Sequence, residues 1–293
     1  MDYYEKIKNE LVENEITKRA KEYSKNKSDL THYYNVGKLL IDAGKHYGEG
    51  IIKKYSRQLT IDLGKGYTET NLKYYRQFYL FSKSHTMCDE LTWSHYRILL
   101  SISDNSKVDY YIYVTRLRRL TVRQLQTVIK SNEYERIEDK SKNKIINNQE
   151  INITDFIKNP LIIKNNLNIE EITEKYLKRI ILDDIEGFIK ELGDGYSFIG
   201  SEYKIKIGDN YNYIDLLLFN YKYNCFVVIE LKITELKKEH IGGIEVYMNY
   251  IDKHVKEINH DKTIGIIICK RNNKLIMEYT SDKRIISREF ILI

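Results

Sequence analysis

The sequence predicts a two-domain protein, with a helical first domain and an α/β second domain. The chain has 293 residues, and about 100–200 residues per domain is usual. Apolar residues in positions 1–131 recur at helical spacing, whereas residues 169–293 follow the order α-β-β-β-α-β. Between these parts, residues 132–168 are polar and rich in asparagine, which is typical of a linker, and short packed pieces are expected within it at 151–157 and 161–163.

Composition excludes several classes of protein. No stretch approaches the roughly 18 uncharged apolar residues that a membrane-spanning helix needs, and the first ten residues lack the apolar core of a secretory signal. The three cysteines, Cys88, Cys225 and Cys269, are far apart and form no CxxC pair. We therefore expect a reduced, cytoplasmic protein without a membrane partner.

Charge is unevenly distributed along the chain. The formal net charge is +6, with an excess of eight positive charges over residues 1–130 and of two negative charges over residues 131–293. Such asymmetry suggests a polyanion as partner, because a basic surface attracts phosphate backbones. A solvated lysine-rich face would produce the same count, and charge alone leaves both interpretations open.

The first domain is expected to contain a helix-turn-helix outline. Helices are predicted at about 33–41, 50–63, 69–81, 97–100, 107–118 and 122–131. Gly64 and Gly66 end the second helix, and Thr68 can cap the third. Basic side chains of this hairpin suit phosphate and base contacts, although an αα-hairpin with a hydrated face is the alternative. The candidate nucleic-acid contacts here are Lys53, Lys54, Arg57, Lys65, Lys73 and Arg76. His95 lies between apolar neighbours and is expected to be structural.

The second domain begins with a helix over 170–192, which Gly193 ends. Strands are expected over 196–207, 212–219, 225–233 and 263–269, and a second amphipathic helix over 239–258. Two short runs near 275–279 and 290–293 complete the domain.

Charged residues interrupt two apolar strands of this domain, in Tyr213-Ile214-Asp215-Leu216-Leu217 and in Val228-Ile229-Glu230-Leu231-Lys232. Buried charges are costly unless they are paired or bound to a metal. If residues 221–224 form a four-residue hairpin loop, Asp215 lies directly opposite Glu230, with Cβ atoms about 4.5–5.5 Å apart. Alternation then places Lys232 on the face of Glu230, and Ile214, Leu216, Ile229 and Leu231 on the other face.

Two opposed carboxylates repel each other, and a divalent cation bound between them would relieve this repulsion. Oxygen ligands favour Mg²⁺ or Mn²⁺, which can activate a water molecule for attack on a phosphodiester and stabilise the developing charge. Lys232 would orient or help to activate that water. The alternative is a purely structural cluster of ion pairs in the sheet, since short matches to this pattern arise by chance.

The same residues resemble the YhcG-like nuclease family of the PD-(D/E)XK superfamily. The resemblance lies in YIDLL and VVIELK, which follow FIKELGDGYSFIG and precede GIEVYMNYID, and in YGEGIIKKYSRQL, NLKYYRQFY, LTWSHYRILLSI and LTVRQLQTVI of the first half. It implies a helical DNA-binding domain joined to a restriction-endonuclease-like domain.

In this resemblance Asp215 and Glu230 match metal ligands, and Lys232 matches the catalytic lysine. The Leu231 carbonyl adds a ligand in the wider superfamily. An acidic residue on the first helix is also implied, with Glu191 as first candidate and Glu186 as second, and Glu202 as a possible outer ligand.

Two positions depart from the family pattern. Ile214 replaces a common proline, which leaves the metal site unaffected. Gly243 stands where similar proteins carry glutamine, which puts the positioning of substrate in question. Tyr247, one turn later, remains as a phosphate or base contact.

These features predict a Mg²⁺-dependent DNA nuclease, and the family resemblance is compatible with a role in recombination, repair or defence. The alternative is a DNA-binding targeting or regulatory protein without cleavage activity, and an RNA nuclease is a third hypothesis. DNA is the expected partner, together with a homodimer, which cutting both strands would require, or further subunits of a larger DNA-processing system.

Overall fold

The chain divides into two compact units in the computed structural model, which describes residues 3–47, 50–63, 65–85, 87–167 and 170–293. Unit 1 comprises Met1–Tyr134 and unit 2 comprises Glu135–Ile293. Unit 1 is helical, and unit 2 is built on a six-stranded mixed sheet with helices. The predicted fold class is confirmed.

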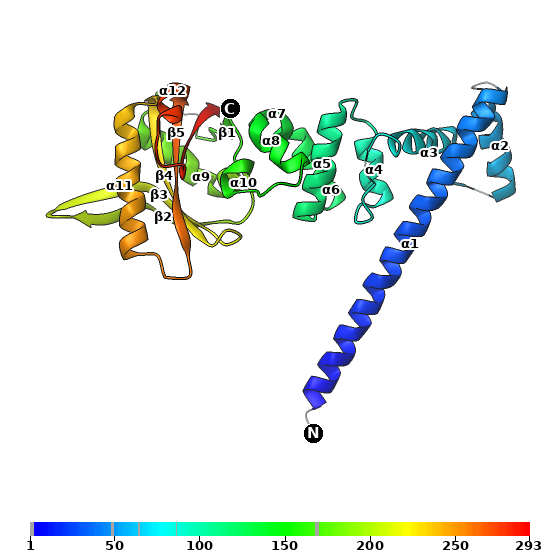
Figure 1. The fold of residues 1–293 in the computed structure, drawn as a ribbon, viewed down its shortest axis with the longest axis horizontal. Coiled ribbons are helices and arrows are strands. Elements are labelled where there is room, and N and C mark those ends of the chain that lie inside the picture. The colour runs from blue at the N-terminus through cyan, green and yellow to red at the C-terminus, as the bar shows by residue number, and fades with distance from the viewer. Residues whose placement is uncertain (1–2, 48–49, 64, 86, 168–169) are drawn as a thin grey trace. The chain divides into compact units, whose positions relative to one another are not determined.

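Six helices make up most of unit 1 among the described residues (Figure 1). They are α1 (Tyr3–Tyr47), α2 (Ile51–Leu63), α3 (Glu69–Phe81), α4 (Trp93–Leu99), α5 (Asn105–Arg118) and α6 (Val122–Lys130). Thr68 caps α3 as predicted, because its side chain accepts a hydrogen bond from the Asn71 N–H. The first helix is much longer than the sequence pattern indicated, since only its C-terminal part carries a clear apolar stripe.

Apolar and aromatic contacts join the helices of unit 1. Leu40 of α1, Ile52 of α2 and Leu72 of α3 are buried in one cluster. Trp93 is part of a second group of packed side chains, which is aromatic, and its ring centroid lies 4.7 Å from that of Tyr33. His95 is buried and neutral in character, because burial lowers its pKa and both ring nitrogens are hydrogen-bonded, to Thr92 and to the Leu120 carbonyl. The predicted structural role of this histidine is confirmed.

The contact between α1 and α3 depends on Gly37. A Cβ atom at this position would lie 2.1 Å from the backbone oxygen of Tyr75. We expect Gly37→Ala to lower the free energy of unfolding by about 1–3 kcal/mol through overpacking, although alanine alone favours a helix by about 1 kcal/mol over glycine. Urea unfolding measures the change. Gly44→Ala, on the same helix where nothing lies within 4 Å, is the control, and equal stability of both variants would contradict the close contact.

Unit 2 is organised around a sheet of strand order β1-β6-β5-β4-β3-β2. Strand β3 runs antiparallel to both of its neighbours, β2 and β4. The pairs β4–β5, β5–β6 and β6–β1 are parallel. The strands are β1 (Leu161–Ile163), β2 (Tyr196–Ile207), β3 (Asn210–Asn220), β4 (Cys225–Glu235), β5 (Asp261–Arg271) and β6 (Ile285–Leu292). The helical segments are α7 (Glu133–Arg136, across the unit boundary), α8 (Asp139–Ile146), η1 (Ile153–Phe156), α9 (Glu174–Asp183), α10 (Ile185–Leu192), α11 (Lys238–His254) and α12 (Lys274–Glu278).

Helices cover both faces of this sheet (Figure 1). On one face, Leu177 of α9 and Phe188 of α10 pack against strand residues such as Val227. On the other, Ile244 and Met248 of α11 pack against a separate set of strand residues. The central strands are therefore buried on both sides, and a charged side chain among them needs a partner.

Two expectations for unit 2 differ from the structure. The single helix over 170–192 is two helices, because Asp184 leaves the helical conformation and its side chain caps α10 by accepting the Gly187 N–H at 2.9 Å. Residues 132–168 contain the helices α7 and α8, which were not expected, whereas η1 and β1 fall on the two short packed pieces expected there, and β1 pairs with β6. The segment is polar on average, but a few of its apolar residues are buried, among them Ile145 and Ile157.

All three cysteines are free and buried. Within the described ranges, no helix is both long enough and apolar enough to cross a membrane.

Candidate active site

The hairpin of β3 and β4 has the predicted register. Asn220 pairs with Cys225 and Leu216 with Ile229, so the loop is the four residues 221–224. The next pair along this register is Asp215 and Glu230. The regular ladder ends before this pair, and Asp215 is close enough to Glu230 for its charge to raise the Glu230 pKa.

Asp215 itself takes part in opening the ladder. Its Oδ2 accepts the Leu231 N–H at 2.9 Å, so a side chain replaces a backbone acceptor. The alternation of the strand breaks at the same place, because Ile214 belongs to the cluster under α11 while Leu216 belongs to the cluster under α9 and α10. The expectation that Ile214 and Leu216 share a face is wrong for this reason.

A third carboxylate extends the row onto β2. Ser201 pairs with Leu216 and Tyr203 with Ile214, so Glu202 lies opposite Asp215 in the register. Glu202 has a φ of 51°, which a residue with a side chain adopts rarely. Neighbouring strands therefore bring Glu202, Asp215 and Glu230 into one row across the sheet.

Two lysines bind these carboxylates. Lys232 Nζ lies 3.4 Å from Glu230 Oε2 and 3.3 Å from Oε2 of Glu174. Lys178 Nζ lies 2.8 Å from Asp215 Oδ1 and also pairs with Glu202. Glu174 and Lys178 are one turn apart on α9, whose start is capped by the Thr173 side chain. Sequence reasoning missed both residues, although they lie in the helix predicted over 170–192. Their spacing of four on a helix next to the strands was the available signal.

The electrostatics of the row reflect its burial. Burial, followed by the negative charge of Asp215, raises the pKa of Glu230 from 4.5 to about 7. Burial lowers the pKa of Lys232, but Glu230 and Glu174 outweigh it, so this pKa lies above its usual value and the ammonium stays charged. Tyr247 of α11 belongs to the same environment, since burial and then Glu230 raise the pKa of its hydroxyl.

The donor set fits a small hard cation. Among the described residues, no three His, Cys, Asp or Glu side chains converge to form a closed metal cage. Mg²⁺ does not require one, because it keeps several waters and is often bound by only one or two carboxylates together with substrate phosphates. Asp215 and Glu230 are such a pair, and the charge of Asp215 is one of the causes that raise the pKa of Glu230. The Leu231 carbonyl remains a predicted ligand.

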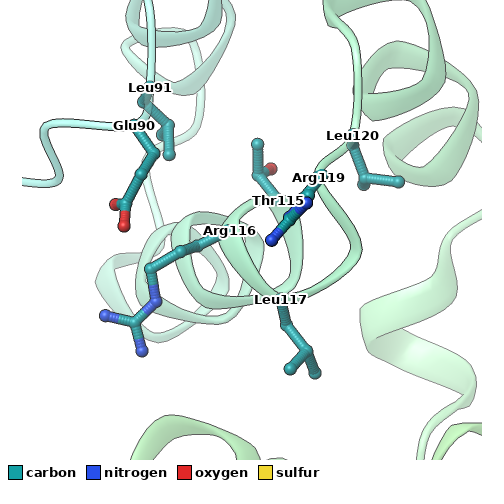
Figure 2. A pocket seen from close by; sticks show the side chains of 7 residues that line it. All are labelled: Glu90, Leu91, Thr115, Arg116, Leu117, Arg119 and Leu120. Carbon is teal, nitrogen blue, oxygen red and sulfur yellow. The ribbon is translucent and has the colours of Figure 1, made fainter. Parts of the chain in front are cut away.

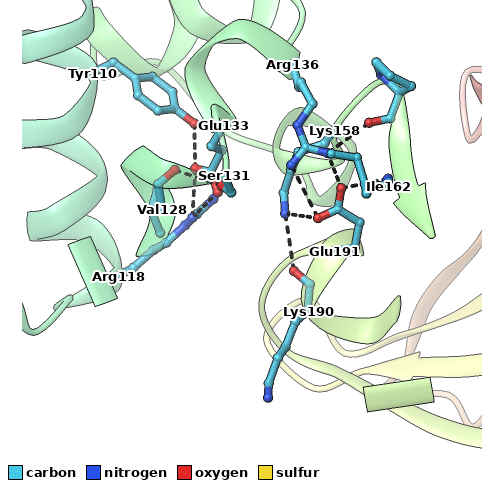
Figure 3. Close-up of polar contacts among 11 residues, drawn as sticks. Tyr110, Arg118, Val128, Ser131, Glu133, Arg136, Lys158, Ile162, Lys190 and Glu191 are labelled. Carbon is cyan, nitrogen blue, oxygen red and sulfur yellow. Dashed lines mark hydrogen bonds and ion pairs between the residues drawn. The ribbon is translucent and has the colours of Figure 1, made fainter. Parts of the chain in front are cut away.

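Glu191 is not brought to this row, contrary to the expectation that it is the acid of the first helix. Its carboxylate pairs with Arg136 and Lys158 and accepts the Ile162 N–H at 2.9 Å (Figure 3). These partners satisfy its oxygens and attach residues 136–162 to α10. Glu186 is exposed and pairs with Lys190. The acid that α9 brings to the site is Glu174.

Helix α11 supplies the remaining neighbours of the row. Burial and then the charge of Lys232 lower the pKa of His240, a residue that sequence reasoning passed over. Gly243 is exposed, and a Cβ atom there would meet nothing within 4 Å. A glutamine at position 243 would therefore fit without a steric conflict.

The basic residues predicted on the α2–α3 hairpin are at the surface of unit 1. Lys53, Lys54, Arg57 and Lys65 are exposed, whereas Arg76 is half-buried. Lys73 is also exposed and pairs with Glu69 at 2.7 Å. The amide of Asn71 donates to the Gly66 carbonyl at 2.7 Å and so stabilises the turn. The hairpin presents positive charge, and its contact with nucleic acid remains a prediction.

Unit 1 also contains a hollow of about 580 Å³ that involves none of these predicted residues. Figure 2 shows its lining, which consists of Glu90, Leu91, Thr115, Arg116, Leu117, Arg119 and Leu120. The Thr115 hydroxyl is buried without a hydrogen-bond partner. Nearby, Arg118 and Tyr110 both donate to Glu133 (Figure 3), an ion pair that joins α5 to the end of the unit.

The raised pKa of Glu230 predicts a pH-dependent stability. As pH rises from 4.5 through 7, the unfolded state loses its proton before the folded state does, so metal-free protein loses stability. Glu230→Gln cannot ionise, and we expect it to be more stable than wild type at pH 8 in EDTA by roughly 3 kcal/mol, at about 1.4 kcal/mol per pKa unit.

Urea unfolding between pH 4.5 and 8 measures this gain, which should shrink toward pH 4.5. Glu186→Gln, at an exposed carboxylate, is the control and should show no such trend. A gain for Glu230→Gln that does not change with pH would refute the buried ionisation.

The sheet, its flanking helices and the Asp215–Glu230–Lys232 group together define a restriction-endonuclease-like nuclease domain. Comparison with known proteins agrees: residues 154–290 match the YhcG PDDEXK nuclease domain, and residues 7–136 match the DUF1016 N-terminal domain. The chain thus contains a YhcG PDDEXK nuclease domain and a DUF1016 N-terminal domain. It is 25% identical over 282 residues to a protein of Escherichia coli (strain K12) named "Putative nuclease YhcG", covering 81% of this chain and 75% of that protein.

Solved structures align with less of the chain. A repair endonuclease from Pyrococcus abyssi is 16% identical, with a TM-score of 0.29 over 43% of this chain and 49% of that one. A complex titled EndoMS-dsDNA2 is 18% identical, with the same TM-score over 43% and 48%. The chain spans about half the length of these structures, and at such TM-scores the likeness carries no weight for function.

Proposed function

We propose that this protein is a divalent-metal-dependent deoxyribonuclease that acts in DNA recombination, repair or defence. The observation that carries the proposal is the placement of Asp215, Glu230 and Lys232 together at the opened end of the β3–β4 ladder. A buried row of carboxylates lowers the stability of the folded protein unless the charges are paired or bind a metal. A role in metal-dependent catalysis would account for such a row in this domain.

The contacts of each residue indicate its role in the proposed reaction. Asp215 and Glu230 would hold Mg²⁺ or Mn²⁺, which when bound polarises the phosphodiester and acidifies a water molecule. Glu174 and Glu230 hold the Lys232 ammonium within 3.4 Å on two sides. From this position Lys232 can donate a hydrogen bond to the attacking water or to a phosphate oxygen. Tyr247, beside Glu230, is a proposed contact for substrate.

DNA is the proposed substrate because the excess positive charge lies in the first half of the chain and because a counterion-covered duplex is attracted to such a surface. Cleavage of both strands needs two active sites, so we include a homodimer or further subunits in the proposal.

Cleavage assays test the enzymatic part of the proposal. Supercoiled plasmid, linear duplex, branched DNA, single-stranded DNA and RNA are each incubated with Mg²⁺, Mn²⁺ or EDTA. We expect metal-dependent cleavage of DNA. Lys232→Ala should be at least about 100-fold slower, as for loss of a proton-transfer group, and Asp215→Asn should also be slower because the metal loses a carboxylate ligand. Lys190→Ala, at an exposed lysine of the same unit, should cut like wild type.

DNA binding without cleavage by wild type in any metal would overturn the nuclease proposal and favour a targeting or regulatory protein. Cleavage of RNA alone would redirect the proposal to a ribonuclease. Cleavage that Lys232→Ala leaves unchanged would move the active site away from the hairpin.

Binding assays test the role of the α2–α3 hairpin separately. We expect the combined variant Lys53→Ala, Lys54→Ala and Arg57→Ala to bind duplex DNA more weakly at every sequence. The slope of log affinity against log salt should fall by about 0.9 per lost phosphate contact.

The matched control for binding removes three exposed lysines of α1, namely Lys21, Lys25 and Lys38. An equal loss in both variants would show that general charge, and not the hairpin, attracts DNA.

A further inference from the structure

The charged side chains around the site alternate in sign, with one exception. Each lysine lies between two carboxylates, as the distances above show. Followed from contact to contact over α9 and the strands, the order is Glu174, Lys232, Glu230, Asp215, Lys178 and Glu202. Glu230 and Asp215 are the one junction in this series where two acids follow each other with no ammonium group between them.

The charge of this group indicates how many cations it can take. When all are ionised, the four carboxylates and two ammonium groups of the series sum to two negative charges. One divalent cation between Asp215 and Glu230 neutralises that charge. A second divalent cation would leave the group positive in a partly buried site, where like charges repel strongly.

Lys178 is held in its place by the fold. Its helix, α9, is attached to the sheet by the fully buried Leu177 and Ile181 on either side of it. Only 14% of the Lys178 side chain is exposed, and its ammonium group contacts carboxylates from β2 and from β3. A lysine is ordinarily charged at neutral pH, and the ammonium group of Lys178 forms ion pairs with both Asp215 and Glu202.

We propose that the Lys178 ammonium group takes the place of a second divalent cation, between Asp215 and Glu202, and so limits this active site to a single metal ion. The inference rests on the proposed function, because it requires a metal at Asp215 and Glu230. It assigns Lys178 a positioning role: the ammonium balances Asp215 on the side away from the metal and directs the cation to the Glu230 side.

The stoichiometry of Mn²⁺ binding tests this inference without reference to cleavage. Full-length protein is titrated with Mn²⁺ alone, and free Mn²⁺ is followed by electron paramagnetic resonance. We expect wild type to bind one Mn²⁺ per chain and Lys178→Met to bind two, because loss of the ammonium group frees Asp215 and Glu202 as ligands and lowers the charge that two cations would leave from +2 to +1. Lys178→Gln serves the same purpose if the methionine variant does not fold, as judged by circular dichroism.

Three variants show whether the effect belongs to the Lys178 charge. Lys178→Arg keeps the charge and should bind one Mn²⁺, and the exposed control Lys190→Met should also bind one. Adding Glu202→Gln to Lys178→Met should return the stoichiometry to one, because the second cation loses a carboxylate. A stoichiometry for Lys178→Met or Lys178→Gln equal to that of wild type overturns the inference.

The two proposals fail in different experiments. Wild-type protein that binds one Mn²⁺ but cuts no nucleic acid contradicts the nuclease proposal, while the change in stoichiometry still stands. Metal-dependent cleavage by wild type, together with unchanged stoichiometry in the Lys178 variants, contradicts only the inference about Lys178.

Discussion

The close approach of two carboxylates at the end of the β3–β4 ladder is the constraint on which the rest of unit 2 depends. The register one step beyond the last regular pair of β3 and β4 sets Asp215 opposite Glu230, and the charge of Asp215 adds to burial in raising the Glu230 pKa, so this repulsion has to be balanced. Three contacts balance this repulsion: the Leu231 N–H donates to Asp215, Lys178 pairs with Asp215, and Lys232 pairs with Glu230. Helix α9 and strand β4 are therefore arranged around charge as well as around apolar packing.

Apolar burial and ionic contacts act together on α9. Its inner face anchors the helix to the sheet through Leu177, Ile180 and Ile181. The same anchoring fixes Glu174 and Lys178 at the row of acids, one turn apart. A helix that is rigid through its core contacts can hold charged groups in a precise arrangement, which is what a reacting site requires.

Much of the nuclease domain could be predicted because its signals are local. The alternation of β3 and β4 and the turn between them determined the hairpin, and the hairpin register then placed Asp215 opposite Glu230. The acid of the first helix could not be located in this way. Glu191 and Glu174 lie in one predicted helix, and only the break at Asp184 and the ion pairs with Arg136 and Lys158 separate their roles.

The sequence by itself determined the two-domain organisation, the helical and α/β classes, the hairpin and its three charged residues. These follow from periodicity and from turn residues, which act over short distances along the chain. Only the tertiary structure decided that residues 135–168 belong to unit 2, that Ile214 and Leu216 face opposite sides, and that Glu174, Lys178 and Glu202 join the site. Such contacts join residues far apart in the chain, and their selection depends on packing and charge balance in three dimensions.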